Sequence, residues 1–202
     1  GPFYIYNYLD AIQPIVKTNY SYSGLKAESE GKYILIHPFA SYDAKQWGLG
    51  KFIKLTESLN KDYYCKIISP EGAIFSDVLS EIKTKKIQFV ETKTIPELLD
   101  QIRECSLFIG NDSGSAHISD LMGKPTVIIY GPTNPSFTKP FFEHNTFILN
   151  EIKCSPNVGE KFCFTFAGIF CPSNECMATL EVERVEKKIL EAKILILMDE
   201  NR

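Results

Sequence analysis

The sequence predicts an α/β fold with a Rossmann-like, doubly wound parallel sheet, and three observations support this prediction. Short apolar runs rich in β-branched residues, such as residues 33–36, are typical of parallel strands buried on both faces. These runs alternate with segments whose apolar residues recur at helical spacing, which indicates repeated βαβ units. The links between the two kinds of segment are short, and their crossovers should be right-handed.

Each element follows from its local pattern. We expect strands at residues 33–36, 64–68, 87–90, 107–109 and 126–130. Helices are expected between them at residues 50–60, 74–82, 95–102 and 115–122, and Pro96 suits the first turn of the third. A further apolar run at residues 146–149 and a closing helix at residues 180–198 complete the domain.

The length and composition fit one well-buried domain. The chain has 202 residues, 44% of them hydrophobic, and two full domains of ordinary size would be a tight fit. Residues 1–31 show no clean period, and we interpret them as an arm or interdomain connection. Gly1-Pro2 looks like the scar of a removed tag, and a natural Gly-Pro is the alternative. Residues 32–202 form the ligand-binding domain, with a cysteine-rich loop at residues 154–176.

Charge and hydropathy argue against several function classes. The net charge is −3, from 22 basic and 25 acidic residues, so the basic excess of a nucleic-acid-binding protein is absent. There is no run of eighteen apolar residues, and no transmembrane segment is expected. The aromatic start lacks the positive region and cleavage site of a signal peptide. We therefore expect no nucleic-acid partner.

Ligands of such a sheet bind beyond the carboxyl ends of the strands, so the residues after each strand are the candidate site. The loop His37–Trp47 can bring backbone N–H groups and the Lys45 cation to a phosphate. The alternative is that His37 and Trp47 are packing residues and Lys45 is solvated. After the second strand, Glu71 can accept from ribose hydroxyls or cap the next helix.

The stretch Gly110–His117 follows the fourth strand and is the most telling. Ser113 and Gly114 lie where a helix begins, so their N–H groups and the helix dipole suit a diphosphate. Asp112 would repel phosphates, so it is either an N-cap or it orients a hydroxyl or Lys45. His117 hydrogen-bonds either a phosphate or a loop carbonyl, or it is a satisfied core residue.

The loop Gly131–Pro140 follows the fifth strand. Thr133, Asn134 and Thr138 supply polar groups on a backbone that prolines hold rigid, which suits the wall of a donor site; a plain turn is the alternative. Together these strand ends favour a phosphate-bearing ligand. There is no G-x-G-x-x-G after the first strand and no Walker sequence, which argues against a standard dinucleotide or P-loop site.

The stretches IHPFASYDAKQW and IGNDSGSAHISDLMGKPTVIIYGPTNPSFTKP resemble glycosyltransferase family 9, the ADP-heptose–lipopolysaccharide heptosyltransferases. Members of that family have two Rossmann-like domains in the GT-B arrangement, and the resemblance, from about Ile34 to Val185, is to the second, nucleotide-sugar-binding domain. Two departures stand out. Phe39 replaces a small residue, which could narrow its loop, and Asp120 is expected to be a surface change.

The resemblance implies roles for individual residues. Lys45 and Asp112 are the candidate catalytic residues, Lys45 as stabiliser of the leaving diphosphate and Asp112 as an acid near the donor sugar. The candidate donor-binding residues have three roles. Ala40 and Ser41 would contact the donor phosphates, and Glu71 would bind the ribose. The phosphate-binding turn would consist of Ser113, Gly114 and His117. Thr133, in the loop Gly131–Pro140, is a further candidate donor-binding residue.

The resemblance also implies a reaction and its partners. Heptose or a similar sugar would move, with inversion, from an ADP-heptose-like nucleotide sugar to a lipopolysaccharide-core-type acceptor. No cofactor or metal is implied for the chemistry, and the place implied is the bacterial cytoplasm, peripheral at the inner membrane. The acceptor domain and its base are expected outside this chain, which alone should bind donor with little turnover. The alternatives are a non-catalytic nucleotide-binding or scaffold module and another GT-B enzyme, such as a nucleotide-sugar epimerase.

Four cysteines cluster near the end of the domain: Cys154, Cys163, Cys171 and Cys176. Their spacing differs from the tight C-x-x-C pairs of a zinc ribbon. Free thiols packed in a Phe-rich loop are expected first, then a structural metal site, and then disulfides formed after purification.

Overall fold

A computed structural model describes residues 31–74, 76–142, 145–155, 163, 171 and 173–200 of the chain. Its centre is one sheet of six parallel strands in the order β3-β2-β1-β4-β5-β6. The strands are β1 (Tyr33–His37), β2 (Cys65–Pro70), β3 (Gln88–Thr92), β4 (Cys105–Asn111), β5 (Thr126–Tyr130) and β6 (Thr146–Leu149). This is the order of a Rossmann sheet, in which the chain reverses direction across the sheet between β1 and β4. The predicted fold class is confirmed.

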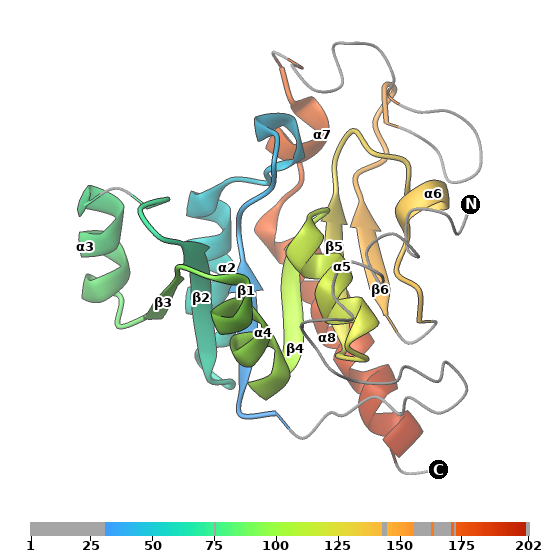
Figure 1. Cartoon of the computed structure of the whole chain (residues 1–202). Coiled ribbons are helices and arrows are strands. Elements are labelled where there is room, and N and C mark those ends of the chain that lie inside the picture. The colour runs from blue at the N-terminus through green and yellow to red at the C-terminus, as the bar shows by residue number, and fades with distance from the viewer. Residues whose placement is uncertain are drawn as a thin grey trace.

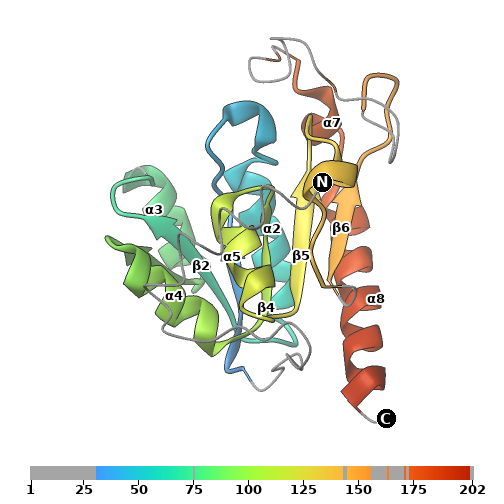
Figure 2. The same ribbon diagram turned by 45° about the vertical axis from the view of Figure 1, so that its right-hand side comes forward.

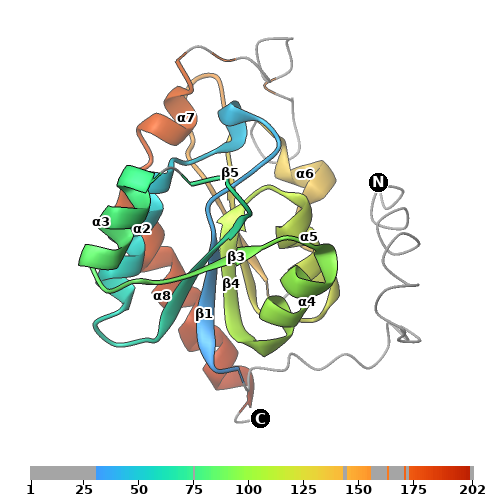
Figure 3. The same cartoon turned by 60° about the vertical axis from the view of Figure 1, so that its left-hand side comes forward.

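Helices cover both faces of the sheet, so the molecule has three layers (Figures 1 and 3). One face carries α2 (Leu49–Leu59), α3 (Ser76–Thr84) and α8 (Val182–Glu200). The other carries α4 (Ile95–Glu104) and α5 (Gly114–Leu121). Three short helices lie towards the end of the molecule where the strands finish, as Figure 2 shows for α7: the 3-10 helix η1 (Asp43–Lys45), α6 (Pro135–Thr138) and α7 (Glu175–Ala178).

The core explains the continuous apolar runs of the central strands. Every residue of β1 and β5 is buried. Ile34 and Ile36 pack with Phe52 of α2 on one face, while Leu35 packs with Ile102 of α4 on the other. Because helices cover both faces of the sheet, apolar and polar residues do not alternate along these strands. Both strands are apolar along most of their length, as is typical of parallel sheets.

Strands β1 and β4 end at the same level. Ile36 pairs with Ile109 and His37 with Gly110. A side chain at Gly110 would come within 3.0 Å of the His37 carbonyl oxygen and of the Phe108 ring, so glycine permits this close pairing. The loops that leave the two strands therefore start side by side, at the point where ligands bind such sheets.

The predicted elements agree with the structure, with shifts at their ends. Strand β2 starts one residue later than predicted and runs to Pro70, and β4 extends on both sides to Cys105 and Asn111. Thr94 caps α4, and Pro96 lies in its first turn as predicted. The predicted arm at residues 1–31 falls, except for Gly31, outside the described residues. None of the helices in the described part of the chain has the length and apolar character needed to cross a bilayer.

Candidate functional site

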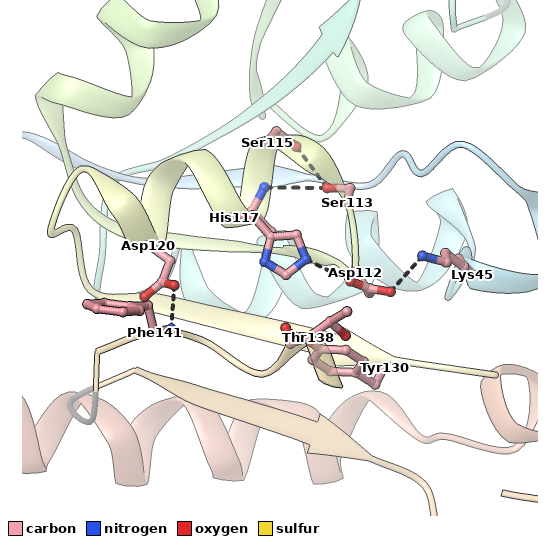
Figure 4. Close-up of polar contacts among 10 residues, drawn as sticks. Lys45, Asp112, Ser113, Ser115, His117, Asp120, Tyr130, Thr138 and Phe141 are labelled. Carbon is pink, nitrogen blue, oxygen red and sulfur yellow. Dashed lines mark hydrogen bonds and ion pairs between the residues drawn. The ribbon is translucent and has the colours of Figure 1, made fainter. Parts of the chain in front are cut away.

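A buried carboxylate bound to two basic side chains lies beyond the ends of β1 and β4 (Figure 4). Asp112 directly follows β4, and its Oδ2 accepts from Lys45 Nζ at 2.7 Å. Its Oδ1 lies 3.0 Å from His117 Nε2. The Asp112 side chain is only 2% exposed, while that of Lys45 is 23% exposed. The cluster thus joins the loop after β1 to the first turn of α5.

Asn111 fixes the position of this loop. Its buried side chain accepts from Trp47 N at 3.0 Å and donates to the Pro38 carbonyl at 2.7 Å. These two bonds clamp both ends of the loop that carries Lys45 onto the end of β4. We assigned no role to Asn111 from the sequence, because we looked for residues that would contact a ligand. A polar residue at the end of a buried strand was the available sign that this side chain bonds other parts of the protein.

The charge of Asp112 is held by its partners. Burial acts to raise the pKa of this carboxyl, but the hydrogen bond from His117 and the positive charge of Lys45 outweigh it and lower the pKa to about 2. Asp112 is therefore ionised at neutral pH.

The amino terminus of α5 opens beside this cluster. Ser113 caps the helix by accepting from Ala116 N at 3.4 Å, and its hydroxyl lies 2.9 Å from that of Ser115. Apart from its chain neighbours and the backbone of α5, no atom of the described residues lies within 4 Å of the place where a side chain on Gly114 would begin, so a ligand can approach the backbone here. The backbone N–H groups and the dipole of the first turn favour an anion.

His37, at the end of β1, contacts the first turn of α5. Its Nδ1 lies 3.1 Å from Ser115 Oγ, and its ring stacks on Phe108. Burial lowers the pKa of His37 to about 4, so it is neutral at physiological pH. As the packing hypothesis expected, it is a core residue.

The structure decides several alternatives that the sequence left open. Lys45 is not simply solvated, and Asp112 is not the N-cap of α5, because that cap is Ser113. His117 Nε2 lies 3.0 Å from the Asp112 carboxylate. Trp47 is a packing residue, as expected: it is buried, and its Nε1 donates to the Leu180 carbonyl at 2.8 Å.

The prediction that Asp120 is a surface change is wrong. Its side chain is buried, and its carboxylate accepts from Phe141 N at 2.5 Å, Phe142 N at 3.3 Å and Asn145 Nδ2 at 2.6 Å. These donors come from residues between α6 and β6, and Figure 4 shows Phe141 beside Asp120. Asp120 thus ties α5 to that segment.

The loop after β5 borders the cluster. Tyr130 ends β5, and its hydroxyl donates to the Thr138 carbonyl. Burial and the negative charge of Asp112 raise the pKa of Tyr130. A side chain at Gly131 would come within 3.0 Å of the Ala44 carbonyl oxygen, so this loop also packs against η1.

The hydrogen bonds and ion pairs of the cluster described above do not include the four remaining predicted residues. Glu71 follows β2, is largely exposed and pairs with Lys93 at 2.7 Å. Ala40 and Ser41 precede η1 and are half-buried and exposed, and Thr133, in the loop after β5, is half-buried. All four lie on loops that follow strands at the carboxyl edge, and their ligand contacts remain predictions.

The four clustered cysteines form no disulfide in the structure. Cys154 is exposed, and Cys176 is buried in the core, where burial raises its pKa to about 11. In the described part of the chain, no three or more His, Cys, Asp or Glu side chains are placed to hold a metal ion.

A cavity of about 560 Å³ lies away from this cluster. Its lining comes from the residues just before β2 and β3, including Lys61, Tyr63 and Lys86. It therefore opens at the amino edge of the sheet, opposite to Asp112, and the polar cluster is the better candidate for ligand chemistry.

Comparison with known proteins gives concordant matches. The model of glycosyltransferase family 9 (heptosyltransferase) matches residues 11–165. Lipooligosaccharide heptosyltransferase 2 of Campylobacter jejuni strain 81116 is 29% identical over 170 residues, which cover 79% of this chain and 51% of that protein.

Two solved structures show the same fold. The family 9 glycosyl transferase of Veillonella parvula superposes with a TM-score of 0.62 at 17% identity, and Escherichia coli ADP-heptose lps heptosyltransferase II with 0.59 at 18%. Each match covers 96% of this chain and 52% of the other. The chain thus spans about half the length of the relatives that it matches.

Proposed function

Because the chain belongs to glycosyltransferase family 9, we propose that it is the donor-binding domain of an inverting glycosyltransferase. The reaction would move heptose or a similar sugar from a nucleotide diphosphate to a lipopolysaccharide-core-type acceptor. The observation that carries the proposal is the Asp112 carboxylate, bound to Lys45 and His117 beside the open amino terminus of α5.

In this proposal the donor diphosphate binds at the start of α5. Ser113, Gly114 and His117 supply the first-turn groups, and Lys45 supplies a cation. The loop Ala40–Ser41 faces the same phosphates from β1. Glu71 exchanges its surface partner Lys93 for the ribose hydroxyls, at small cost because exposed ion pairs are weak. Thr133 lines the side formed by the loop after β5.

Catalysis on the donor side is electrostatic. As the bond between sugar and phosphate breaks, negative charge grows on the departing diphosphate, and Lys45 with the helix dipole stabilises it. Asp112 keeps Lys45 Nζ in place with a 2.7 Å contact. With a pKa of about 2, this carboxylate is too weak a base to take the acceptor proton, so its role is to orient Lys45 and the sugar.

The acceptor hydroxyl must lose a proton, and we propose that its base belongs to another part of the protein. The matched part is only 51% of the length of the Campylobacter jejuni relative, which supports that division of labour. The same part would bind the lipopolysaccharide-type acceptor. The 202-residue chain alone is then expected to bind donor and to transfer little or no sugar.

Calorimetry with ADP-heptose, UDP-glucose and GDP-mannose tests the donor assignment. We expect ADP-heptose to bind and ADP to compete with it, because the phosphate-binding groups contact both. Binding of UDP-glucose or GDP-mannose instead would show that the donor carries a different nucleobase, and the chain would still be a donor-binding domain. Binding of none would favour a scaffold module.

A further inference from the structure

Two polar atoms in the loop after β5 have no hydrogen-bond partner although protein atoms cover them. They are Asn134 Nδ2 and Thr138 Oγ1, and no other side-chain nitrogen or oxygen among the described residues is in this state. Buried polar atoms are almost always bonded, because an unmade hydrogen bond destabilises the fold. Both atoms lie in one five-residue segment, which needs an explanation.

The geometry of the segment leaves these two atoms free for another partner. Asn134 Oδ1 accepts from Ser136 N at 2.9 Å and caps α6, which fixes the amide and directs Nδ2 away from that bond. The carbonyl of Thr138 is already taken by the Tyr130 hydroxyl. Thr138 is half-buried, so a rotation about χ1 can turn its hydroxyl towards a ligand.

The segment lies next to the acidic centre of the site. Asn111 pairs with Ile129, and Asp112 N donates to the Ile129 carbonyl at 3.0 Å, so Asp112 is level with Tyr130. Figure 4 shows Thr138 and Tyr130 together beside Asp112. Lys45 binds the same carboxylate from the loop after β1. A ligand with its phosphates near Lys45 would extend its next group towards Thr138.

We infer that Thr138 Oγ1 and Asn134 Nδ2 bind hydroxyl groups of the donor sugar, an inference that rests on the proposed function. A sugar presents hydroxyls that both donate and accept hydrogen bonds. The carboxylate of Asp112 accepts, the amide of Asn134 donates, and the hydroxyl of Thr138 does both, so the three groups complement a polyhydroxylated ring. The loop after β5 then determines which sugar is accepted, while the start of α5 holds the diphosphate.

The test compares ADP with ADP-heptose, measured by calorimetry on the 202-residue chain and on its variants. Thr138→Val keeps the shape and removes the hydroxyl, and Asn134→Ser keeps a capping oxygen and removes the amide N–H₂. Each variant should bind ADP as the wild type does and bind ADP-heptose about 3- to 10-fold more weakly, the effect of one lost hydrogen bond. Thr138→Val should leave the melting temperature unchanged or raise it, because the hydroxyl that it removes is unbonded.

Thr126→Val is the matched control. Thr126 is also buried, but its hydroxyl donates to the Lys124 carbonyl at 2.8 Å and lies 3.0 Å from Ser119 Oγ, at the other end of β5. This variant should melt at a lower temperature and keep the wild-type ratio of the two affinities.

The outcomes separate the inference from the proposed function. If the wild type binds ADP but the ratio of affinities is unchanged in both Thr138→Val and Asn134→Ser, the inference is overturned and the donor domain stands. Equal binding of ADP and ADP-heptose by the wild type overturns it in the same way. If the wild type binds neither, the proposed function fails, and the inference with it.

Discussion

Lys45 is the residue whose replacement tests the cluster most directly. Its ammonium group lies 2.7 Å from a buried carboxylate and remains 23% exposed, so it can contact both Asp112 and a bound phosphate. Lys45→Met should weaken ADP binding about 10- to 100-fold, because a charge-assisted hydrogen bond is lost and the Asp112 charge loses a neutralising partner. Calorimetry measures the change.

The control is Lys54→Met, which removes an exposed lysine from α2 and should leave ADP affinity unaltered. Wild-type affinity in Lys45→Met would remove Lys45 from the phosphate site. In a complete, active transferase the same change should lower the rate of transfer by about 10²- to 10³-fold.

His37 and Asp112 should produce two separate windows of acid destabilisation. The pKa of His37 is about 4 in the folded chain and 6.5 as a model value, so the unfolded chain binds more protons between these values. Stability is then lost as the pH falls from about 6.5 to about 4, by about 3 kcal/mol. Asp112, with its pKa lowered from 3.8 to about 2, loses its contribution only below about pH 4.

Urea unfolding at a series of pH values separates the two windows. His37→Gln can keep a hydrogen bond to Ser115 without titrating, and it should flatten the slope between pH 6.5 and 4 only. Asp112→Asn should alter only the slope below about pH 4. An unchanged upper slope in His37→Gln would mean that folding does not lower the pKa of His37.

At this residue scale, the local pattern singled out residues that the structure places together, but it did not predict the bonds between them. Strand ends marked Lys45, Asp112 and His117 as ligand-facing, and the structure brings these three together. The burial of Asp120 could not be predicted, because its partners lie more than twenty residues away and fold over it only in the complete domain. Charged residues are so rarely buried that an exposed site was the reasonable expectation.

Helix α5 connects the ligand site to the rest of the domain. Its first turn carries Ser113 and His117, and near its other end Asp120 holds Phe141, Phe142 and Asn145. Asn145 in turn accepts from Thr126 N at 2.8 Å, at the start of β5. The helix and the two strands beyond it therefore form one rigid support for the loop after β5.

Asp120→Ala tests this connection. The change leaves two backbone N–H groups and the Asn145 amide without their acceptor, so the free energy of unfolding should fall by about 2 kcal/mol. Urea unfolding followed by circular dichroism measures it. Asp100→Ala, which removes an exposed carboxylate paired only with Arg103, should change it by less than about 0.5 kcal/mol. Equal small effects would show that solvent replaces the bonds of Asp120.

Elements with enough length were predictable, and the short ones were not. The six strands and the five longer helices stand out because apolar residues mark each of them. The helices at residues 43–45, 135–138 and 175–178 span about one turn, too few residues to establish a period of 3.6. Strand β4 ends in the polar Asn111 because its backbone pairs with Ile129, a register that hydropathy does not reveal.

At the scale of the whole molecule, contacts near the carboxyl edge join the start of the chain's domain to its end. Lys51 Nζ, on α2, donates to the carbonyls of Met177, Ala178 and Leu180. Helix α8 then packs along α2 on the same face of the sheet (Figure 3). The candidate site is thus built on strands β1 and β4. The residues of α7 and those just before α8 hold α2 and the loop after β1 in place.

Trp47 provides a measurement of this whole arrangement. It is the only tryptophan, its ring packs edge-on against Phe52 at 5.0 Å between centroids, and its Nε1 bonds the Leu180 carbonyl. Because the ring bonds a carbonyl that lies 133 residues further along the chain, its fluorescence should change only when the domain unfolds as a unit. We expect fluorescence and far-ultraviolet circular dichroism to give the same urea midpoint.

Trp47→Phe should lower the free energy of unfolding by about 2 kcal/mol, mainly through the cavity that it leaves, because Lys51 still bonds the Leu180 carbonyl. ADP affinity should persist, since the bond from Trp47 N to Asn111 belongs to the backbone. A fluorescence midpoint well below the circular dichroism midpoint would show instead that α7 and α8 detach before the sheet unfolds.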